Sequence, residues 1–253
     1  MSALAPAAAE WVKLRTVRPT WWLLFGFAAV AIGLGYLAGE TIARPVDSTD
    51  TDFDPIMVPF FGLLVAQLLL ISFAVVAVGG EYSHGTIRSS LAAVPRRGRF
   101  YAAKMAVVGL FTAAAALVVE LATFAVAQWR LGDWAAEFDG EAIQALLGGW
   151  IHLTLLSLFG AGITAMLRSA VVTLSVLLPV LFLSSQGLGS LPAIRSWAQY
   201  LPDQVGMVVM HMTVPGDPTF GRDYGAWTGI GILVLWTAAS LVGGWIVMRR
   251  RDA

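Results

Sequence analysis

Two ionisable side chains lie inside long apolar segments of the sequence, where a charge is costly. Glu120 belongs to one such segment and His152 to the next. A charged group at the centre of a bilayer costs about 2.5–3.5 kcal/mol, so each residue needs a partner or a task. Glu120 is nine residues inward from Trp129, and His152 is nine residues inward from Ile143, about 13 Å at the helical rise. On antiparallel helices the two side chains would therefore lie at similar depth. They could pair with each other, contact a substrate or serve a protonation-linked function.

The remaining residues exclude several common kinds of chemistry. The sequence has no cysteine, which excludes disulfides, thiolate catalysis and thiol-ligated metal. The three histidines are too far apart in the sequence for a metal-ligand motif, so no metal site is predicted. A phosphate-binding loop needs Gly-Lys followed by Ser or Thr, but the only lysines are Lys13, after Val12, and Lys104, after Ala103. This chain is therefore not expected to bind ATP itself, and its zero net charge gives no reason to expect a nucleic-acid partner.

The composition predicts a membrane protein. Hydrophobic residues make up 58% of the chain and charged residues 13%, against about 25% charged residues in soluble domains. A spanning helix needs about 20 predominantly apolar residues. Six segments meet that requirement, and no connection is long enough for a second domain, so we expect one all-α membrane domain over residues 1–253. The predicted spans are residues 21–38, 59–79, 102–129, 143–166, 171–187 and 224–248.

The placement of basic residues predicts the orientation of these six spans. Twelve of the sixteen basic residues fall before the first span, between spans 2 and 3, between spans 4 and 5, or after span 6. Short cytoplasmic loops carry an excess of lysine and arginine. Both termini should therefore be cytoplasmic. The segment before span 6 is too apolar for a free loop, and we expect it to dip into the outer leaflet as short helices.

The connection between spans 2 and 3 has the sequence pattern of a short folded helix. Gly85 can end the preceding helix in the left-handed conformation, and Thr86 can cap a new one. About two turns follow before Pro95 stops the helix. Five basic residues lie between Glu81 and Lys104 inclusive, against one acid. We expect Glu81 to lie near water, where a local ion pair with one of these basic residues is worth at most about 1 kcal/mol.

This connection resembles the coupling-helix region of type-2 ABC-transporter permeases, the membrane subunits of ATP-binding-cassette exporters. Two further segments are similar to parts of that family: Glu10 to Trp22 is similar to its amphipathic N-terminal helix, and Tyr200 to Gly206 to its extracellular re-entrant region. The residues of the connection that match the family's pattern are Glu81, Tyr82, Gly85, Thr86, Ile87, Arg88, Leu91, Pro95, Arg97 and Lys104.

The resemblance implies partners that the residues alone do not show. A permease of this family would work in a bacterial inner (plasma) membrane, paired with a second permease as a homodimer or heterodimer. Two copies of an ABC ATPase would hold ATP and Mg²⁺ and would dock on the coupling helix. Arg168, in the turn between spans 4 and 5, could make a smaller second contact with the ATPase or could serve as a lipid-headgroup or topology arginine. An alternative from another class is an intramembrane enzyme that uses Glu120 and His152.

Overall fold

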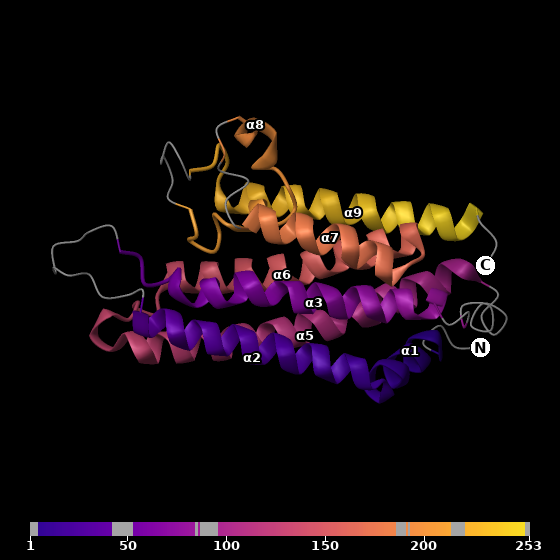
Figure 1. Cartoon of the computed structure of the whole chain (residues 1–253), viewed down its shortest axis with the longest axis horizontal. Helices are drawn as coiled ribbons and strands as arrows, with labels where there is room; N and C mark the ends of the chain where they lie inside the picture. Colours follow the sequence, from indigo (N-terminus) through magenta and orange to yellow (C-terminus); the bar gives the residue numbers. More distant parts are fainter. Residues whose placement is uncertain are drawn as a thin grey trace.

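The structure is a computed structural model that describes residues 5–41, 53–83, 86, 96–185, 191, 193–213 and 221–250. Within these ranges the regular structure is helical and contains no β-strand, so the predicted all-α class is confirmed. Figure 1 shows the long helices side by side along the longest axis of the molecule, with the chain running back and forth between its two ends. The helices are α1 (Ala5–Thr16), α2 (Arg18–Thr41), α3 (Val58–Ser83), α5 (Arg97–Leu131), α6 (Gly140–Leu167), α7 (Ala170–Ser185), α8 (Arg195–Ala198) and α9 (Ala226–Arg250), with 3-10 turns η1 (Gly132–Trp134) and η3 (Gln204–Gly206).

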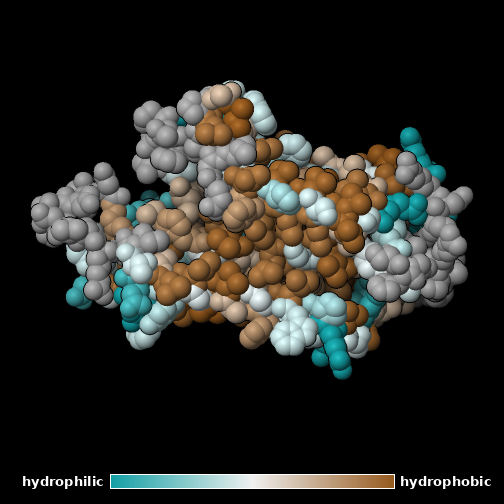
Figure 2. Space-filling view, in the orientation of Figure 1, coloured by the Kyte–Doolittle hydropathy of each residue, from teal (hydrophilic) through white to brown (hydrophobic). Residues whose placement is uncertain are grey.

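Five of the described helices are long and apolar enough to cross a membrane: α2, α3, α5, α6 and α9. Helix α7, at the position of the predicted span 171–187, has 16 residues, about 24 Å at the helical rise, against a hydrocarbon core of about 30 Å. The last two residues of that predicted span lie outside the described residues. Figure 2 shows a broad hydrophobic band across the middle of the face in view, with hydrophilic residues gathered towards its two ends. The chain is therefore a multi-pass membrane protein.

Basic residues gather at one end of the bundle, which we call the basic end. It is formed by α1, the first turns of α5 and the last turns of α3, α6 and α9 (right in Figure 1). The opposite end, called the far end, carries the 3-10 turns and α8. Described basic residues at the basic end are Lys13, Arg15, Arg18, Arg96, Arg97, Arg99, Lys104, Arg168, Arg249 and Arg250. The sequence grouped these same residues on one side of the membrane.

The predicted N-terminal helix from Glu10 to Trp22 is divided in the structure. Helix α1 ends at Thr16 and α2 begins at Arg18, so the two meet at an angle around Val17. Pro19 lies in the first turn of α2, where its missing N–H costs no hydrogen bond. The break lets α2 run along the bundle while α1 turns back against α5.

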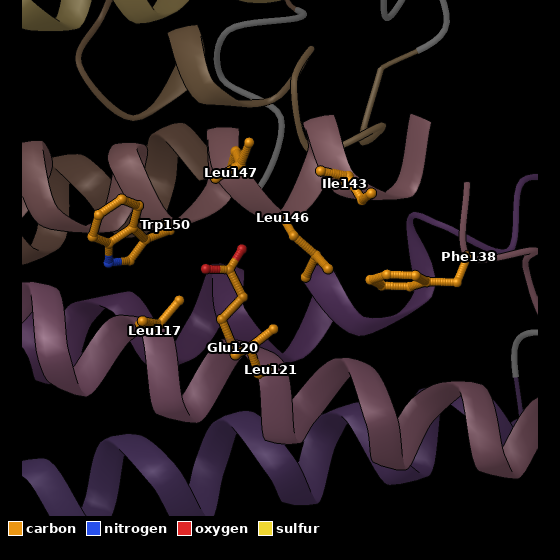
Figure 3. A pocket seen from close by; sticks show the side chains of 8 residues that line it. All are labelled: Leu117, Glu120, Leu121, Phe138, Ile143, Leu146, Leu147 and Trp150. Atoms are coloured by element: carbon orange, nitrogen blue, oxygen red, sulfur yellow. The ribbon is translucent and has the colours of Figure 1, made fainter. Parts of the chain in front are cut away.

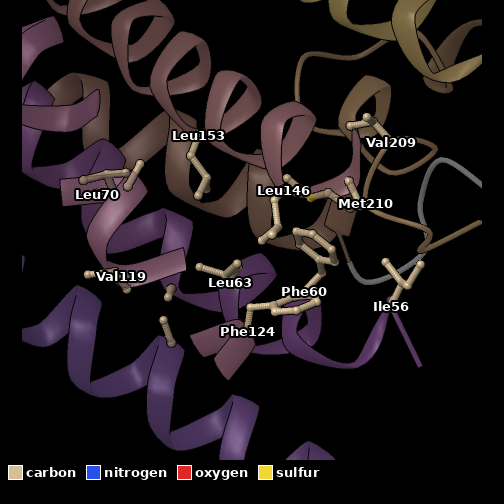
Figure 4. Close-up of a cluster of buried hydrophobic side chains, with 14 of the residues drawn as sticks. Ile56, Phe60, Leu63, Leu70, Val119, Phe124, Leu146, Leu153, Val209 and Met210 are labelled. Carbon is tan, nitrogen blue, oxygen red and sulfur yellow. The ribbon is translucent and has the colours of Figure 1, made fainter. Parts of the chain in front are cut away.

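The largest buried cluster lies towards the far end, where α2, α3, α5 and α6 meet. Figure 4 shows Phe60 and Leu63 of α3 facing Phe124 of α5, with Leu146 of α6 and Met210 of the segment before α9 closing the cluster. Such side chains fill the spaces between helices that approach closely at small residues. The segment before α9 therefore belongs to the packed interior, as its apolar composition indicated.

Glycine residues set the closest contact between α6 and α9. A Cβ atom on Gly162 of α6 would lie 2.7 Å from the backbone carbon of Ser240 and 2.9 Å from the nitrogen of Leu241. By contrast, a Cβ atom on Gly231 of α9 would meet no atom within 4 Å. Small residues bring transmembrane helices together because lipid supplies no hydrophobic force between them. The small residue Gly162 therefore lets α6 and α9 pack closely at this point.

These two glycines give a matched test of the packing. Gly162→Ala should destabilise the protein, because the new methyl group must push α9 away. Overpacking of this kind costs about 1–3 kcal/mol. Gly231→Ala should be neutral or stabilising by up to about 1 kcal/mol, because alanine favours the helix and the site has room. Thermal unfolding of both variants in detergent measures the difference. Equal melting temperatures would contradict the contact.

Candidate functional site

Four charged side chains form a cluster at the basic end, and three of them are buried. Glu81, in the last turns of α3, forms ion pairs with Lys13 of α1 and with Lys104 of α5, whose Nζ lies 3.0 Å from Glu81 Oε2. The same Lys104 Nζ donates a hydrogen bond to Glu10 Oε2 of α1 at 2.5 Å. Glu81 and Lys104 are each only 2% exposed. We call these four residues the charge cluster; two carboxylates and two ammonium groups balance within it.

The arrangement follows from one face of α1. Glu10 and Leu14 lie one helical turn apart and are both buried, and Lys13 is one turn from Glu10 on the adjoining face. Trp11 packs against Phe111 of α5, with ring centroids 4.6 Å apart. This aromatic contact and the Glu10–Lys104 pair hold α1 along the first half of α5, and the Lys13–Glu81 pair ties α1 to α3.

The expectation that Glu81 lies near water is wrong. Its local partner is indeed one of the basic residues that follow it, Lys104, but the pair is buried and Lys13 joins it from another helix. Glu81 Oε2 and Lys104 Nζ are close enough to form an ion pair, but their relative orientation does not meet the geometry of a hydrogen bond. Removing one partner of a buried pair leaves a buried charge, so Glu81 is worth more to stability than a surface residue.

The other predicted coupling residues fall around this cluster or outside the described residues. The Arg168 guanidinium lies 5.3 Å from the ring centroid of Tyr82, and Arg168 itself ends α6 in the left-handed conformation, with φ 58°. Thr86 is exposed, and its hydroxyl lies 3.5 Å from the carbonyl oxygen of Glu81. Arg97 donates a hydrogen bond to the Met248 carbonyl near the end of α9 at 3.2 Å. Gly85, Ile87, Arg88, Leu91 and Pro95 lie outside the described residues.

A cavity of about 330 Å³ lies beside the charge cluster, between α1, the first turns of α2 and the end of α3. Lys13, Glu81 and Thr86 line it together with apolar side chains, among them Leu23 and Phe73. Lys13 is the most exposed of the four residues in the cluster, with 37% of its side chain exposed. The cluster is therefore closed on the α5 side and open towards this cavity.

Glu120 is buried within the bundle without a partner. Its side chain is 2% exposed, and neither carboxylate oxygen has a hydrogen-bond partner in the described part of the chain. Figure 3 shows the carboxylate directed from α5 towards α6, between Trp150 and Leu146. Oε1 lies over Gly149, where a Cβ atom would collide with it. A pocket of about 190 Å³ opens at this point, lined otherwise by apolar side chains.

The predicted depth of His152 holds, but no hydrogen bond joins it to Glu120. His152 Nε2 lies 3.3 Å from Oε1 of Gln67 on α3, and its other ring nitrogen has no partner among the described residues. Gly206 packs directly over the imidazole ring. Since Gly149 is three residues before His152, the two ionisable groups differ in depth by only about 4.5 Å. They face different neighbours at nearly the same level.

Three functional candidates escaped the sequence reading. The sequence predicted only an amphipathic helix for the segment that contains Glu10 and Lys13. Their spacing of one helical turn, next to Leu14, is the one local feature that indicates ion pairs with other helices. Gln67 is a buried amide in the otherwise apolar first half of α3, and this contrast could have been recognised in the sequence. Their partners lie on other helices, so no local pattern could name them.

The segment before α9 is held by a polar network at the far end. Gln204 donates to the Ser184 carbonyl at 2.9 Å and to Asp203 Oδ2 at 2.8 Å, and accepts from Arg222 at 2.7 Å. Burial raises the pKa of Asp203 to about 6, although its hydrogen bond with Gln204 and the charge of Arg222 oppose the rise. These contacts place residues 203–206 against the ends of α7 and α9.

A second far-end contact ties this segment to the start of α3. His211 Nδ1 lies 2.6 Å from Asp54 Oδ2. The hydrogen bond to Asp54 raises the pKa of His211, partial burial opposes the rise, and the charges of Asp54 and Glu141 add to it. Partial burial raises the pKa of Asp54, but hydrogen bonds from His211 and the Ile56 N–H outweigh it, so the net shift is downward. The pair is therefore favoured in its ionised form.

The charge cluster predicts unequal effects of its two lysines. Lys104→Met keeps the chain length but leaves Glu10 and Glu81 short of a buried cation, and should cost about 3 kcal/mol of unfolding free energy. Lys13→Met should cost about 1 kcal/mol, because Lys13 is partly exposed and water can replace it. Equilibrium unfolding in detergent measures both.

A double variant tests whether the cluster acts as a unit. Adding Glu10→Gln to Lys104→Met removes one charge of each sign, so the two changes together should cost less than the sum of the single ones. Additive losses would show that Glu10 and Lys104 do not interact.

The His211–Asp54 pair predicts a pH-dependent stability. A raised histidine pKa stabilises the fold below the unfolded value of about 6.5 and loses this effect as pH rises through the folded pKa. His211 has φ 56°, which asparagine tolerates, so His211→Asn is a suitable neutral variant. Wild type should exceed this variant by at most about 1 kcal/mol near pH 6, and the gap should close towards pH 9. Because the pKa of Asp54 is lowered, the stability that its carboxylate gives the fold is lost only below about pH 3.8. A gap that is constant from pH 6 to 9 would contradict the ionised pair.

Comparison with known proteins agrees with a multi-pass membrane protein. A search of curated proteins found no match to the chain. A model of the ABC-2 family transporter proteins matches residues 8–189, a stretch that contains α2 through α7, the charge cluster and Glu120. This match covers well over half of the chain. The chain therefore belongs to the ABC-2 family of transporter proteins, as a membrane permease of an ABC transporter.

Proposed function

We propose that this chain is the permease subunit of an ATP-driven exporter, coupling ATP hydrolysis by a separate ATPase to alternating access. The observation that carries the proposal is the charge cluster. It fixes Glu81, at the end of α3, to α1 and α5, and the predicted coupling helix begins only a few residues later. Both lysines of the chain belong to this cluster, in keeping with an ATP site on another subunit.

The cluster suggests how a push at the basic end reaches the bundle. Separating charges that are buried together is costly, so the end of α3, the start of α5 and α1 should move as one unit. An ATPase that closes on ATP and presses on the segment after Glu81 would tilt these helices together. Tyr82 beside Arg168 extends the same unit to the turn between α6 and α7.

Six spans and a re-entrant segment complete the proposed architecture. Helix α7 alternates in direction with α6 and α9 (Figure 1) and packs on α3 and α6, which supports counting it as the fifth of six spans. Residues 204–207 and 209–210 are buried against the bundle at the far end. Gly206 over His152 supports a segment that re-enters the membrane from outside.

The proposed assembly is a pair of permeases with two ABC ATPases in a bacterial inner membrane. The basic end would face the cytoplasm, where ATP is available, because lysine and arginine accumulate on that side. Drugs, lipids and peptides are all compatible with a bundle of this kind, since fold does not determine substrate. The alternative of an intramembrane enzyme needs Glu120 and His152 to act together. Their lack of a shared hydrogen bond gives it no support.

Co-purification with a matched pair of charge reversals tests the proposal. The tagged chain, extracted from its native membranes, should bring down a protein with ATPase activity. Arg88→Glu, in the predicted coupling helix, should lower the ATPase recovered by about tenfold or more, as loss of a charged interface contact does. Asp133→Lys, at an exposed position at the far end, should leave it unchanged.

Two results would overturn the proposal. One is a wild-type chain that brings down no ATPase activity. The other is full recovery of the ATPase with Arg88→Glu in a protein that melts like wild type, because the docking element would then lie elsewhere.

A further inference from the structure

The pocket at Glu120 combines one carboxyl group with an otherwise apolar lining. Besides the carboxylate, it is lined by Leu117, Leu121, Phe138, Ile143, Leu146, Leu147 and Trp150. The side chain of Glu120 is 2% exposed and both of its oxygens lack a hydrogen-bond partner within the described ranges. Buried polar groups are almost always hydrogen-bonded, so a carboxyl group left in this state is prepared for a partner from outside the fold.

The neighbouring polar groups that could have neutralised the carboxylate are bonded elsewhere. His152, at nearly the same depth, contacts Gln67. The indole N–H of Trp150, which lines the same pocket, donates to the Ala113 carbonyl at 2.8 Å. Figure 3 shows the carboxylate in the gap between α5 and α6 with apolar side chains on either side of it. Without a cation, a carboxyl group in these apolar surroundings is neutral, so a partner that ionises it must bring a basic group of its own.

The mouth of the pocket lies on the surface that would face lipid. Leu117, Leu121 and Leu147 at its rim are between 42% and 47% exposed, and they belong to helices long enough to span the membrane. Glu120 is about 13 Å along the helix from Trp129, too deep for a lipid headgroup held at the interface. The pocket is thus open to molecules dissolved in the hydrocarbon region.

The size of the pocket limits the apolar part of such a molecule. An engineered apolar cavity of about 150 Å³ holds benzene, so about 190 Å³ accommodates a single ring with a short chain. Phe138 and Trp150 add aromatic surface, which attracts cations as well as apolar groups.

We propose that this pocket is a binding site for lipophilic amines, with the ammonium group paired to Glu120 and the apolar body among the leucines. The assignment names a substrate class and therefore rests on the proposed transport function. The neutral carboxyl group gives its proton to the amine, and the resulting carboxylate accepts hydrogen bonds from the N–H groups of the ammonium ion. An alcohol of the same shape offers no such charge and should bind much less.

Binding of a matched pair of small molecules to the isolated permease tests this site. The full chain is placed in phosphatidylglycerol nanodiscs, whose lipid carries no ammonium group. Radiolabelled 4-phenylbutylamine, charged at neutral pH, is compared with 4-phenylbutanol. Wild type should bind the amine saturably and at least about tenfold more tightly than the alcohol. Glu120→Gln, which keeps the shape, should lose that tenfold preference.

A second variant guards against a misfolded first one. Leu147→Trp keeps the carboxylate but narrows the mouth at an exposed position, so it should weaken amine binding while the melting temperature stays near that of wild type. Equal binding of amine and alcohol by wild type, or undiminished amine binding by a folded Glu120→Gln, would overturn the site. No ATPase takes part in this measurement, so its failure is distinct from a failure to recover the ATPase with the chain.

Discussion

Four charged groups close together, three of them buried, constrain the basic end of this bundle. A single charge removed from water is unfavourable by several kcal/mol, and two carboxylates with two ammonium groups are tolerated only when all four are close. Glu10 and Lys13 therefore fix where α1 lies, and Lys104 fixes how α5 begins. Because Glu81 completes the set, the end of α3 is held in the same place. The chain that leaves α3 enters the predicted coupling helix from a fixed point.

The rest of the bundle depends on shape. Between membrane helices, lipid tails are as apolar as leucine, so packing and small residues decide which helices meet. Gly162 lets α9 approach α6, and a Cβ atom on Gly62 of α3 would lie 2.8 Å from the nitrogen of Gly35 on α2. These contacts lie between the polar networks of the two ends. A movement imposed at the basic end would therefore pass through closely packed backbones, which change position as whole helices because packed interiors deform little.

The sequence was sufficient to predict the helices but not their rotation. Each predicted span lies within a few residues of an observed helix, because a long apolar run in a membrane must form all its backbone hydrogen bonds internally. The observed helices extend further, as α5 does from Arg97 to Leu131, since polar residues at a helix end do not stop it. The depth of Glu120 and His152 followed from counting residues. Their partners did not, because three residues from Gly149 to His152 turn a side chain by about 300°.

Long-range pairing explains the other failures of the sequence reading. Lys104 and Glu10 are 94 positions apart, and nothing near either residue indicates the other. The position of Glu81 looked solvent-exposed because basic residues follow it, yet α1 folds back and covers it. Local patterns report which side of a membrane a charge occupies. They do not report whether another helix will bury that charge.

The charge cluster and Glu120 are buried carboxylate sites that differ in a way that bears on function. At the basic end each carboxylate has a lysine, and the charges cancel within the fold. At Glu120 no described residue supplies a cation, so the carboxyl group stays neutral until a basic partner pairs with it. A position that served only packing would be better filled by leucine, which fits the same space and leaves no polar atom unsatisfied. The isolated carboxylate is therefore best explained by a partner that comes and goes, whereas the paired ones hold the helices that must move around it.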